Sequence, residues 1–492
     1  MKPLAFIFFS VCLPINLQAS TIVVCDDVAD PAALDPHLSF DNKAYGIFHN
    51  VYEGLVRLDK DGNVVPSLAQ SWDVIAGQGL RFHLRQGARF HDGTKCDAQA
   101  VRESLKRQLK LANSVTLQLG PIRDVIAEST SNLRLDTDEP PEVALRRLAV
   151  FGLIVPIPLA ASLGERPVGT GPYRFASWKK GAELVLEHNP QHWESQPPYF
   201  KRIVFKFIPI EKQIDALING EVDLVAEIPG TRTLEVAKTR GLKIVKQETL
   251  VTHTFWFTNF RGPLARREIR QALNLAINKE DMIRYGALGN GKPLATFSMK
   301  GEVGHDPTLA PYPYNPELAK RMLAKAGWPK DFILKMFSTQ QSERESRMLK
   351  KYFEQVGLKV ELEVRPIKDV TRIISENRIR DYDVFANQAP DPLAHVCFLA
   401  SICLHSRSPA SAGGVPGFDE LYQKMMQTRD PEEHERLARE LDRWIYDEAL
   451  GLFTYQRIRT FGLKSGLKYS PHFTGMLMNL DQAVMEDEKH ER

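Results

Sequence analysis

Two glycines and a lysine have the spacing of a phosphate-binding loop. Gly286, Gly291 and Lys292 reproduce the pattern G-x-x-x-x-G-K, whose backbone amides hold phosphate groups in nucleotide-binding proteins. The next residue is Pro293, however, where Mg²⁺ coordination needs Ser or Thr, and a helix is predicted before the loop where the motif needs a strand. The pattern therefore does not predict nucleotide binding.

Nucleophilic and metal chemistry have no better support. The sequence contains no G-x-S-x-G, H-E-x-x-H or C-x-x-C motif, so neither a nucleophile elbow, a zincin helix nor a dithiol redox loop is indicated. Thirteen histidines are scattered along the chain. Polar surface or hydrogen-bonded core positions account for them better than a shared site, although some could meet in space: His37, His83, His91, His395 and His405. We predict no catalytic residue, no metal ion and no cofactor.

Two cysteines, Cys397 and Cys403, form a close pair. Residues six apart on a helix point to different faces, so a bond between them requires a loop or turn. We predict a disulfide that pins such a loop; the alternative is two buried thiols. Whether Cys25 and Cys96 also pair is left open.

Strands and helices alternate in the second half of the chain. Apolar periodicity predicts the order strand, helix, strand, helix, strand over residues 332–338, 343–355, 358–364, 369–376 and 382–386. This order predicts a doubly wound α/β region. Ligands of such sheets bind beyond the carboxyl ends of the strands, so Asn387 to Asp391 is the first candidate site.

Helix signals are clear at other places. Asp97 can cap a helix over 98–110. Asn315 and Pro316 predict the start of another helix, and Gly327 its end. A strongly amphipathic helix is predicted from Ile269 to Ile277.

Composition limits the class of protein. The chain has 492 residues, 43% of them hydrophobic and 25% charged, which predicts about three globular domains. The formal charge of +3 comes from interspersed acids and bases, so we expect no nucleic-acid partner.

The N-terminus resembles a secretory signal peptide. Lys2 precedes an apolar run from Leu4 to Leu13, and Leu17 and Ala19 suit cleavage after Ala19. The alternative, a membrane anchor, would need about 20 apolar residues. We predict a signal peptide over 1–19 and an exported chain.

Several motifs in order along the chain resemble the extracellular solute-binding proteins of family 5. The most specific is a Trp followed by F-x-L-R, F-x-D-G and A-x-x-V, here Trp72, 82–85, 90–93 and 98–101. Further matches are VGTGPYRF at 168–175, NPQHW at 189–193, LINGEVDL at 217–224, IRQALNLAINKEDMI at 269–283 and YNPELAKRMLAKAGW at 314–328.

The resemblance implies an α/β, two-lobed periplasmic-binding-protein fold (class II, venus-flytrap) with an extra domain inserted in the first lobe. Lobe I would comprise 20–40, 166–259 and 460–492, the inserted domain II 41–165, and lobe III 260–459. The implied function is that of a periplasmic receptor, expected to be monomeric and without catalysis. It would deliver a small, peptide-like solute to the membrane permease of an ABC transporter.

In peptide-binding members of this family, the strand that leads to the site ends in a pattern resembling W-x-x-D-x-x-D-P, whose first Asp takes the α-amino group of the ligand. This chain has Gln388 at that position, between Asn387 and Asp391. A neutral amide lacks the charge that makes ammonium recognition strong. Asp391 has an alternative role in capping the following turn. Other candidate ligand-binding residues are Phe40, Lys43, Tyr45, Trp256 and Thr258.

Two other interpretations stay open. Gln388, with His395 and His405 nearby in the sequence, would suit a non-peptide solute such as a nickel or other metal chelate or haem. A secreted hydrolase is the alternative of another class.

Overall fold

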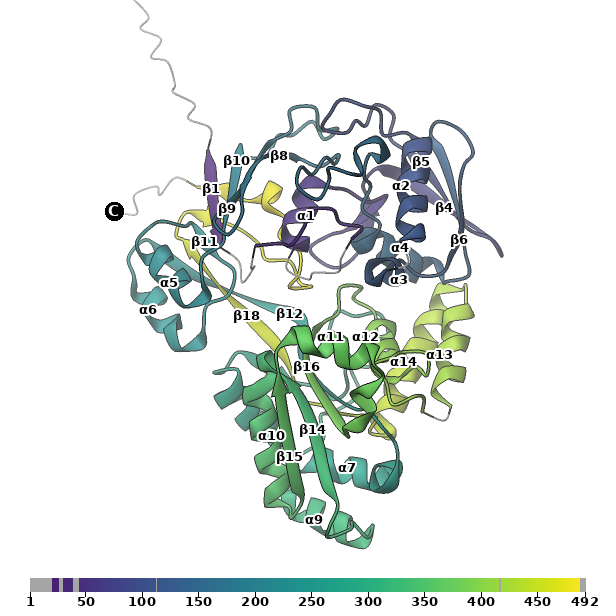
Figure 1. The fold of residues 1–492 in the computed structure, drawn as a ribbon, viewed down its shortest axis with the longest axis vertical. Coiled ribbons are helices and arrows are strands. Elements are labelled where there is room, and N and C mark those ends of the chain that lie inside the picture. The colour runs from purple at the N-terminus through teal and green to yellow at the C-terminus, as the bar shows by residue number, and fades with distance from the viewer. Residues whose placement is uncertain (1–19, 26–29, 39–43, 112, 416, 487–492) are drawn as a thin grey trace, which may run out of the picture.

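The computed structural model describes residues 20–25, 30–38, 44–111, 113–415 and 417–486. The predicted signal peptide and the candidate residues Phe40 and Lys43 lie outside these ranges. Two bodies, one above the other in Figure 1, share a single 12-stranded sheet. Ten of its strands have the order β15-β14-β16-β12-β18-β11-β1-β10-β9-β8, while β13 pairs with β18 and β17 pairs with β12. In the described part of the chain, no helix combines the length and the apolar character needed to cross a membrane.

The upper body contains a part that we call lobe I. Its short β1 (Thr21–Cys25) pairs in parallel with β10 (Arg202–Lys206) on one side and with β11 (Leu224–Val225) on the other. Beyond β10, antiparallel strands form the edge of the sheet. The edge strands and the helices of this lobe are β8 (Tyr173–Lys179), β9 (Glu183–His188), α5 (Ile210–Ile218) and α6 (Thr233–Lys238).

We call the part of the upper body that lies between β1 and β8 in the sequence the inserted domain. Its four-stranded antiparallel sheet has the order β4 (Ala69–Ile75), β5 (Gly79–Leu84), β7 (Asn132–Thr137) and β6 (Ile122–Ala127). Its other elements are α1 (Tyr45–Val51), β2 (Val56–Leu58), β3 (Val64–Pro66), α2 (Ala98–Lys110), α3 (Ser114–Leu119) and α4 (Pro141–Phe151). The predicted cap of α2 is confirmed, since an Asp97 oxygen accepts the backbone N–H of Ala100 at 3.0 Å.

The lower body, lobe III, contains the predicted alternation of strands and helices. The parallel strands β14 (Ile333–Thr339), β15 (Lys359–Arg365) and β16 (Val384–Pro390) alternate with α10 (Glu343–Gln355) and α11 (Ile367–Ser375). Its other elements are α7 (Arg267–Leu275), α8 (Lys279–Asp281), the π-helical turn η4 (Met282–Gly286), β13 (Gly291–Pro293), α9 (Pro316–Lys325), α12 (Cys397–Leu404), α13 (Phe418–Gln427), α14 (Pro431–Asp447) and β17 (Gly451–Leu452).

Strand β16 is longer than predicted. It runs on to Pro390 because residues 387–390 pair with residues 251–254 of β12 (Leu242–Phe257). Asn387 and Gln388 therefore belong to the strand itself and do not follow its end.

The predicted Cys397–Cys403 disulfide is wrong. Both residues lie on α12 as buried free thiols, and a helix turns residues six apart to different faces. The apolar run that contains them favours a buried helix instead of a loop. Burial raises the pKa of both thiols, which keeps them protonated. Cys25 and Cys96 are not joined either, since the Cys25 thiol donates to the Lys206 carbonyl at 3.4 Å.

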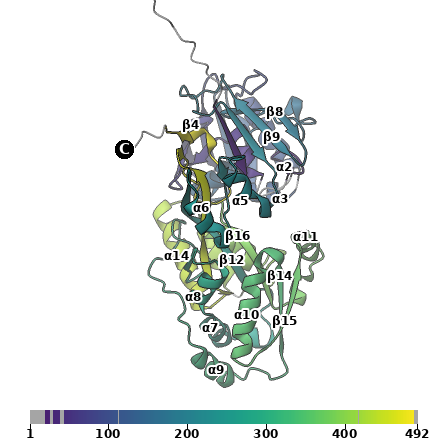
Figure 2. The ribbon, with the colours of Figure 1, turned by 90° about the vertical axis from the view of Figure 1, so that its left-hand side faces the viewer.

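Two long strands connect the bodies, as Figure 2 shows for β12 at the waist of the molecule. In lobe I, residues 242–248 of β12 pair with residues 458–464 of β18 (Tyr455–Lys464). The register shifts between Glu248 and Thr252, and from Val251 onward β12 pairs with β16. This irregularity lies where β12 passes from lobe I to lobe III and gains β16 as a partner, which is the place expected for a hinge, so we call β12 and β18 the hinge strands.

Candidate ligand-binding site between the lobes

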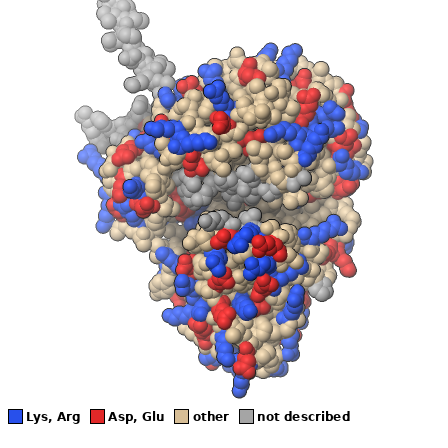
Figure 3. Space-filling view, viewed as in Figure 1, with Lys and Arg blue, Asp and Glu red and all other residues tan. Residues whose placement is uncertain are grey.

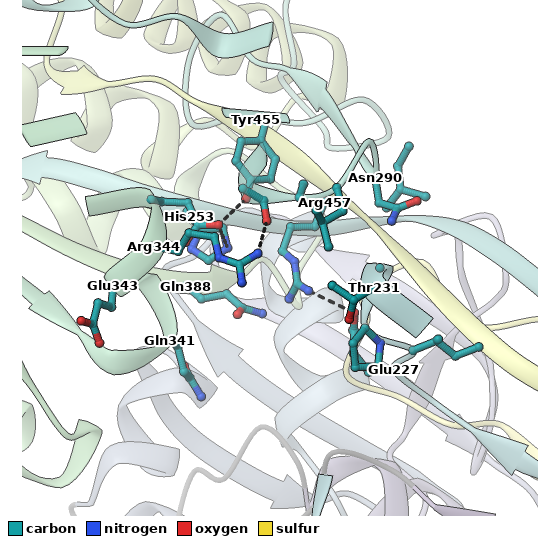
Figure 4. A pocket seen from close by; sticks show the side chains of 18 of the residues that line it. Glu227, Thr231, His253, Asn290, Gln341, Glu343, Arg344, Gln388, Tyr455 and Arg457 are labelled. Carbon is teal, nitrogen blue, oxygen red and sulfur yellow. Dashed lines mark hydrogen bonds and ion pairs between the residues drawn. The ribbon is translucent and has the colours of Figure 1, made fainter. Parts of the chain in front are cut away.

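A cavity of about 680 Å³ lies beside the hinge, between lobe I and lobe III. Its wall combines both hinge strands with one loop of lobe I and three segments of lobe III, and Figure 4 shows their side chains converging. The lining residues are 227–231, His253, 286–288, Asn290, Gln340, Gln341, 343–345, Arg347, Gln388 and 455–458, without Gln456. A site built from both lobes can distinguish a closed from an open arrangement.

The hinge strands contribute a hydrogen-bonded wall. His253 Nδ1 lies 2.9 Å from Ser342 Oγ, and its Nε2 lies 3.7 Å from Glu345 Oε1. The hydroxyl of Tyr455 on β18 donates to the same Glu345 oxygen at 2.8 Å. Burial lowers the pKa of His253 to about 4, so the ring is neutral near pH 7. This network fixes the side chains of two hinge strands against the start of α10.

Lobe I contributes an acid that is already paired. Glu227 accepts hydrogen bonds from Arg457 at 3.1 Å and from Arg459 at 2.9 Å. Both arginines lie on β18, so this pair ties the lobe I loop to the hinge strand. Glu227 is thus largely neutralised by the protein itself.

Arg344 is an arginine of the lining that is not engaged in an ion pair within the described part of the chain. Its neighbour Arg347 is paired with Glu343 at 2.6 Å, whereas Arg344 makes no ion pair with any residue that the structure describes. Its recorded contact is a long hydrogen bond from Nη1 to the Gly286 carbonyl, at 3.4 Å. Figure 4 shows its side chain at the centre of the cavity. A guanidinium with free donors suits a carboxylate or a similar anion.

The two lobes touch closely at the rim of the cavity. A Cβ at Gly230 of lobe I would lie 2.6 Å from Cβ and 2.7 Å from Cδ1 of Leu288 in lobe III. Leu288 itself has a φ of 50°, in the left-handed region that branched side chains rarely occupy. Such a conformation persists only where its surroundings impose it, which makes this contact a candidate element of lobe closure.

Of the predicted site residues, Gln388 lines the cavity. It pairs with His253 across β12 and β16, so the two side chains come from neighbouring strands. Asn387, one residue earlier, accepts a hydrogen bond from Thr339 at 3.3 Å. Asp391 is fully buried, and its Oδ1 accepts the backbone N–H of Leu393 at 2.8 Å, which is the turn-capping alternative.

Three other candidates are buried away from the cavity. The Trp256 ring packs on Phe385, and its Nε1 donates to the Ala410 carbonyl at 2.8 Å. Thr258 donates to the Tyr382 carbonyl at 2.6 Å, deep in lobe III. Tyr45 lies in the core of the upper body with its ring against Phe151.

His253, Arg344, Tyr455 and Arg457 line the cavity but were not among the residues predicted from the sequence. The rule that pointed to Asn387 applies equally to the polar residues from Gln340 onward, which follow the predicted strand over 332–338. The segment excluded as a phosphate loop, from Gly286 to Asn290, also lines the cavity. Gly291 and Lys292 lie in β13, so the segment has no phosphate-loop geometry.

The two histidines that suggested a metal chelate do not face the cavity. His395 is buried, and its Nε2 lies 2.8 Å from Nε2 of His434, while His405 lies 3.8 Å from Asp419. In the described residues, no group of three or more His, Cys, Asp or Glu side chains is arranged to hold a metal ion.

The buried carboxyl group of Asp391 should make the free energy of unfolding depend on pH. Burial raises its pKa to about 7, so the folded chain keeps a proton that the unfolded chain releases near pH 4. Between these values stability falls as the pH rises. We expect Asp391→Asn to reduce the slope of unfolding free energy against pH by up to about one proton equivalent, measured by urea unfolding between pH 4 and 8.

Asp331→Asn is the matched control, because that side chain is fully exposed. It should keep the wild-type slope. An Asp391→Asn slope equal to that of the wild type would show that Asp391 titrates normally.

Comparisons with known proteins decide the family. The sequence model described as "Bacterial extracellular solute-binding proteins, family 5 Middle" matches residues 63–395, more than half of the chain. The chain belongs to family 5 of these proteins. The expected two-lobed α/β fold of family 5 is confirmed by solved structures. One is the periplasmic binding protein DppA from Helicobacter pylori in complex with the peptide STSA, with a TM-score of 0.80 and 21% identity over 95% of this chain and 98% of that one.

Curated relatives within family 5 are distant. The glutathione-binding protein GsiB of Pectobacterium atrosepticum is 27% identical over 345 residues, and the match covers 67% of this chain and 66% of GsiB. The probable D,D-dipeptide-binding periplasmic protein DdpA of Escherichia coli K12 is 23% identical over 466 residues, or 89% of this chain and 88% of DdpA. These relatives are binding proteins rather than enzymes.

Proposed function

We propose that this protein is the periplasmic solute receptor of an ABC transporter. It captures a small, peptide-like solute between lobes I and III and delivers it to a membrane permease, as a monomer and without catalysis. The observation that carries this proposal is the cavity of about 680 Å³ whose wall comes from both lobes and both hinge strands. A volume of several hundred Å³ suits a small ligand.

The charge of the lining supports a solute that carries a carboxylate. Arg344 has free donors, whereas the Glu227, Glu343 and Glu345 carboxylates already have partners within the protein. At the position where an aspartate would bind an ammonium group stands Gln388, which favours neutral hydrogen-bonding groups there. An acidic, peptide-like molecule fits this lining, and the relatives that bind glutathione and dipeptides are consistent with that class.

The test is to identify the solute that co-purifies with the protein from its own host, by native mass spectrometry followed by denaturation. We expect a carboxylate-bearing compound at near one-to-one stoichiometry, together with a raised Tm when it is added back. A recovered metal chelate or haem would contradict the peptide-like class. Absence of any co-purified compound and of any Tm shift across peptide panels would contradict the receptor function itself.

A further inference from the structure

Two arginines join the inserted domain to lobe III, and neither lines the cavity. Arg146 of α4 donates from Nη1 to the Leu393 carbonyl of lobe III at 3.0 Å. In the opposite direction, Arg429 of lobe III donates to the Thr137 carbonyl at 3.2 Å and to the Glu139 carbonyl. Each body thus supplies one arginine and accepts the other on backbone oxygens. Figure 1 shows α4 above α12 and α13, on the side of the molecule opposite α5 and α6.

Both ends of these contacts are held rigidly. Arg146 is only 6% exposed, and Glu142 fixes its Nε at 2.6 Å. The Glu139 side chain is buried and accepts from Arg147 Nε at 3.0 Å, which holds the loop that presents the carbonyls to Arg429. Hydrogen bonds from a charged donor in a fixed orientation are stronger than those between neutral groups.

One of the two contacts is connected to the ligand cavity. Leu393 belongs to the turn that Asp391 caps, and this turn directly follows β16. Gln388 of the same strand lines the cavity. A displacement of lobe III that opens the cavity would therefore also move the carbonyl that Arg146 binds.

Figure 3 shows acidic and basic residues mixed over the visible face of both bodies. The hydrogen bonds of Arg146 and Arg429 are thus specific polar contacts between the inserted domain and lobe III. Breaking them exposes carbonyls and guanidinium groups that water can solvate, so the contacts can be reversible.

We propose that Arg146 and Arg429 form an interlobe clasp through which the inserted domain stabilises the closed receptor. The inserted domain then raises affinity for the solute without touching it, because the fraction of closed molecules sets the apparent affinity. This inference rests on the proposed function, since it concerns the regulation of the same site.

The test measures lobe closure directly, without any solute. Spin labels are attached through Leu117→Cys on the inserted domain and Ile367→Cys on lobe III, both more than half exposed, whereas Cys25, Cys96, Cys397 and Cys403 are buried. The protein is stripped of solute in urea and refolded, and the distance between the two labels is then measured by pulsed electron–electron double resonance. We expect a short-distance population, which corresponds to this structure, and we expect Arg429→Ala to lower its ratio to the long-distance population about 10-fold.

Arg436→Ala is the matched control, because Arg436 is an exposed arginine of the adjacent α14 that pairs with Glu433 and Glu440 of the same helix. It should leave the distance distribution unchanged. Arg146→Ala should act like Arg429→Ala if it folds, as judged by circular dichroism. Equal distributions in the wild type and Arg429→Ala, or a wild type without short distances, would overturn the clasp. Failure to find a solute would contradict the proposed function but leave this distance measurement valid.

Discussion

Replacement of Arg344 by alanine is expected to weaken binding of the co-purified solute about 100-fold, as measured by isothermal titration calorimetry. Hydrogen bonds to charged groups contribute about 1.5–3 kcal/mol each, and 1.4 kcal/mol corresponds to about a tenfold change in Kd. Arg344 is the lining cation without a carboxylate partner among the described residues, so its donors are available to a bound anion. Its removal would leave that anion unpaired in a partly enclosed site.

Two further variants separate charge from geometry. Arg344→Lys should give an intermediate Kd, because lysine keeps the charge but cannot form the paired hydrogen bonds of a guanidinium. Arg436→Ala, which removes an exposed arginine of α14 far from the lining, should bind like the wild type. A Kd for Arg344→Ala within about threefold of the wild type would place the anion elsewhere.

A methyl group at Gly230 is expected to weaken binding of the same solute by about 10- to 100-fold. The new Cβ would lie 2.6 Å from Cβ of Leu288, an atom that cannot move without its backbone. That backbone is already in the left-handed region, with a φ of 50°. Overpacking of this kind costs about 1–3 kcal/mol, which here opposes the contact between lobes I and III.

A matched glycine and a second-site change control this experiment. Gly164→Ala should have no effect, because its Cβ would meet only the Ala33 Cβ at 3.8 Å. In the Gly230→Ala background, Leu288→Gly removes the colliding atoms and suits the positive φ, so it should restore much of the lost affinity. Wild-type binding by Gly230→Ala, or no recovery in the double variant, would show that this rim contact does not govern closure.

Much of lobe III could be predicted from local sequence signals. The bounds predicted for α10 agree with the structure, and Asn315 caps α9 with its side chain on the backbone N–H of Leu318 at 2.9 Å. Caps, prolines and apolar periodicity act within a few residues, so a sequence displays them directly. The extension of β16 to Pro390 was missed because it depends on pairing with β12, more than a hundred residues earlier.

The candidate site was predictable only in part, for the same reason. Gln388 was found because strand order pointed to it, whereas Arg344 and Arg457 reach the cavity only after two lobes meet. Trp256 and Thr258 were placed in the site because they lie in the segment expected to cross towards the second lobe. Beyond Thr254 both faces of this strand are covered by lobe III, with Phe255 in one core cluster and Trp256 in the other.

The central claim is that a solute binds in the cavity between lobes I and III, and hydrogen–deuterium exchange with and without the co-purified solute tests it most directly. Backbone amides that become closed off exchange more slowly. We predict that the solute slows exchange in all three of the lining segments 227–231, 286–290 and 340–347, which come from both lobes. Slower exchange confined to another region, with these three segments unchanged, would contradict it.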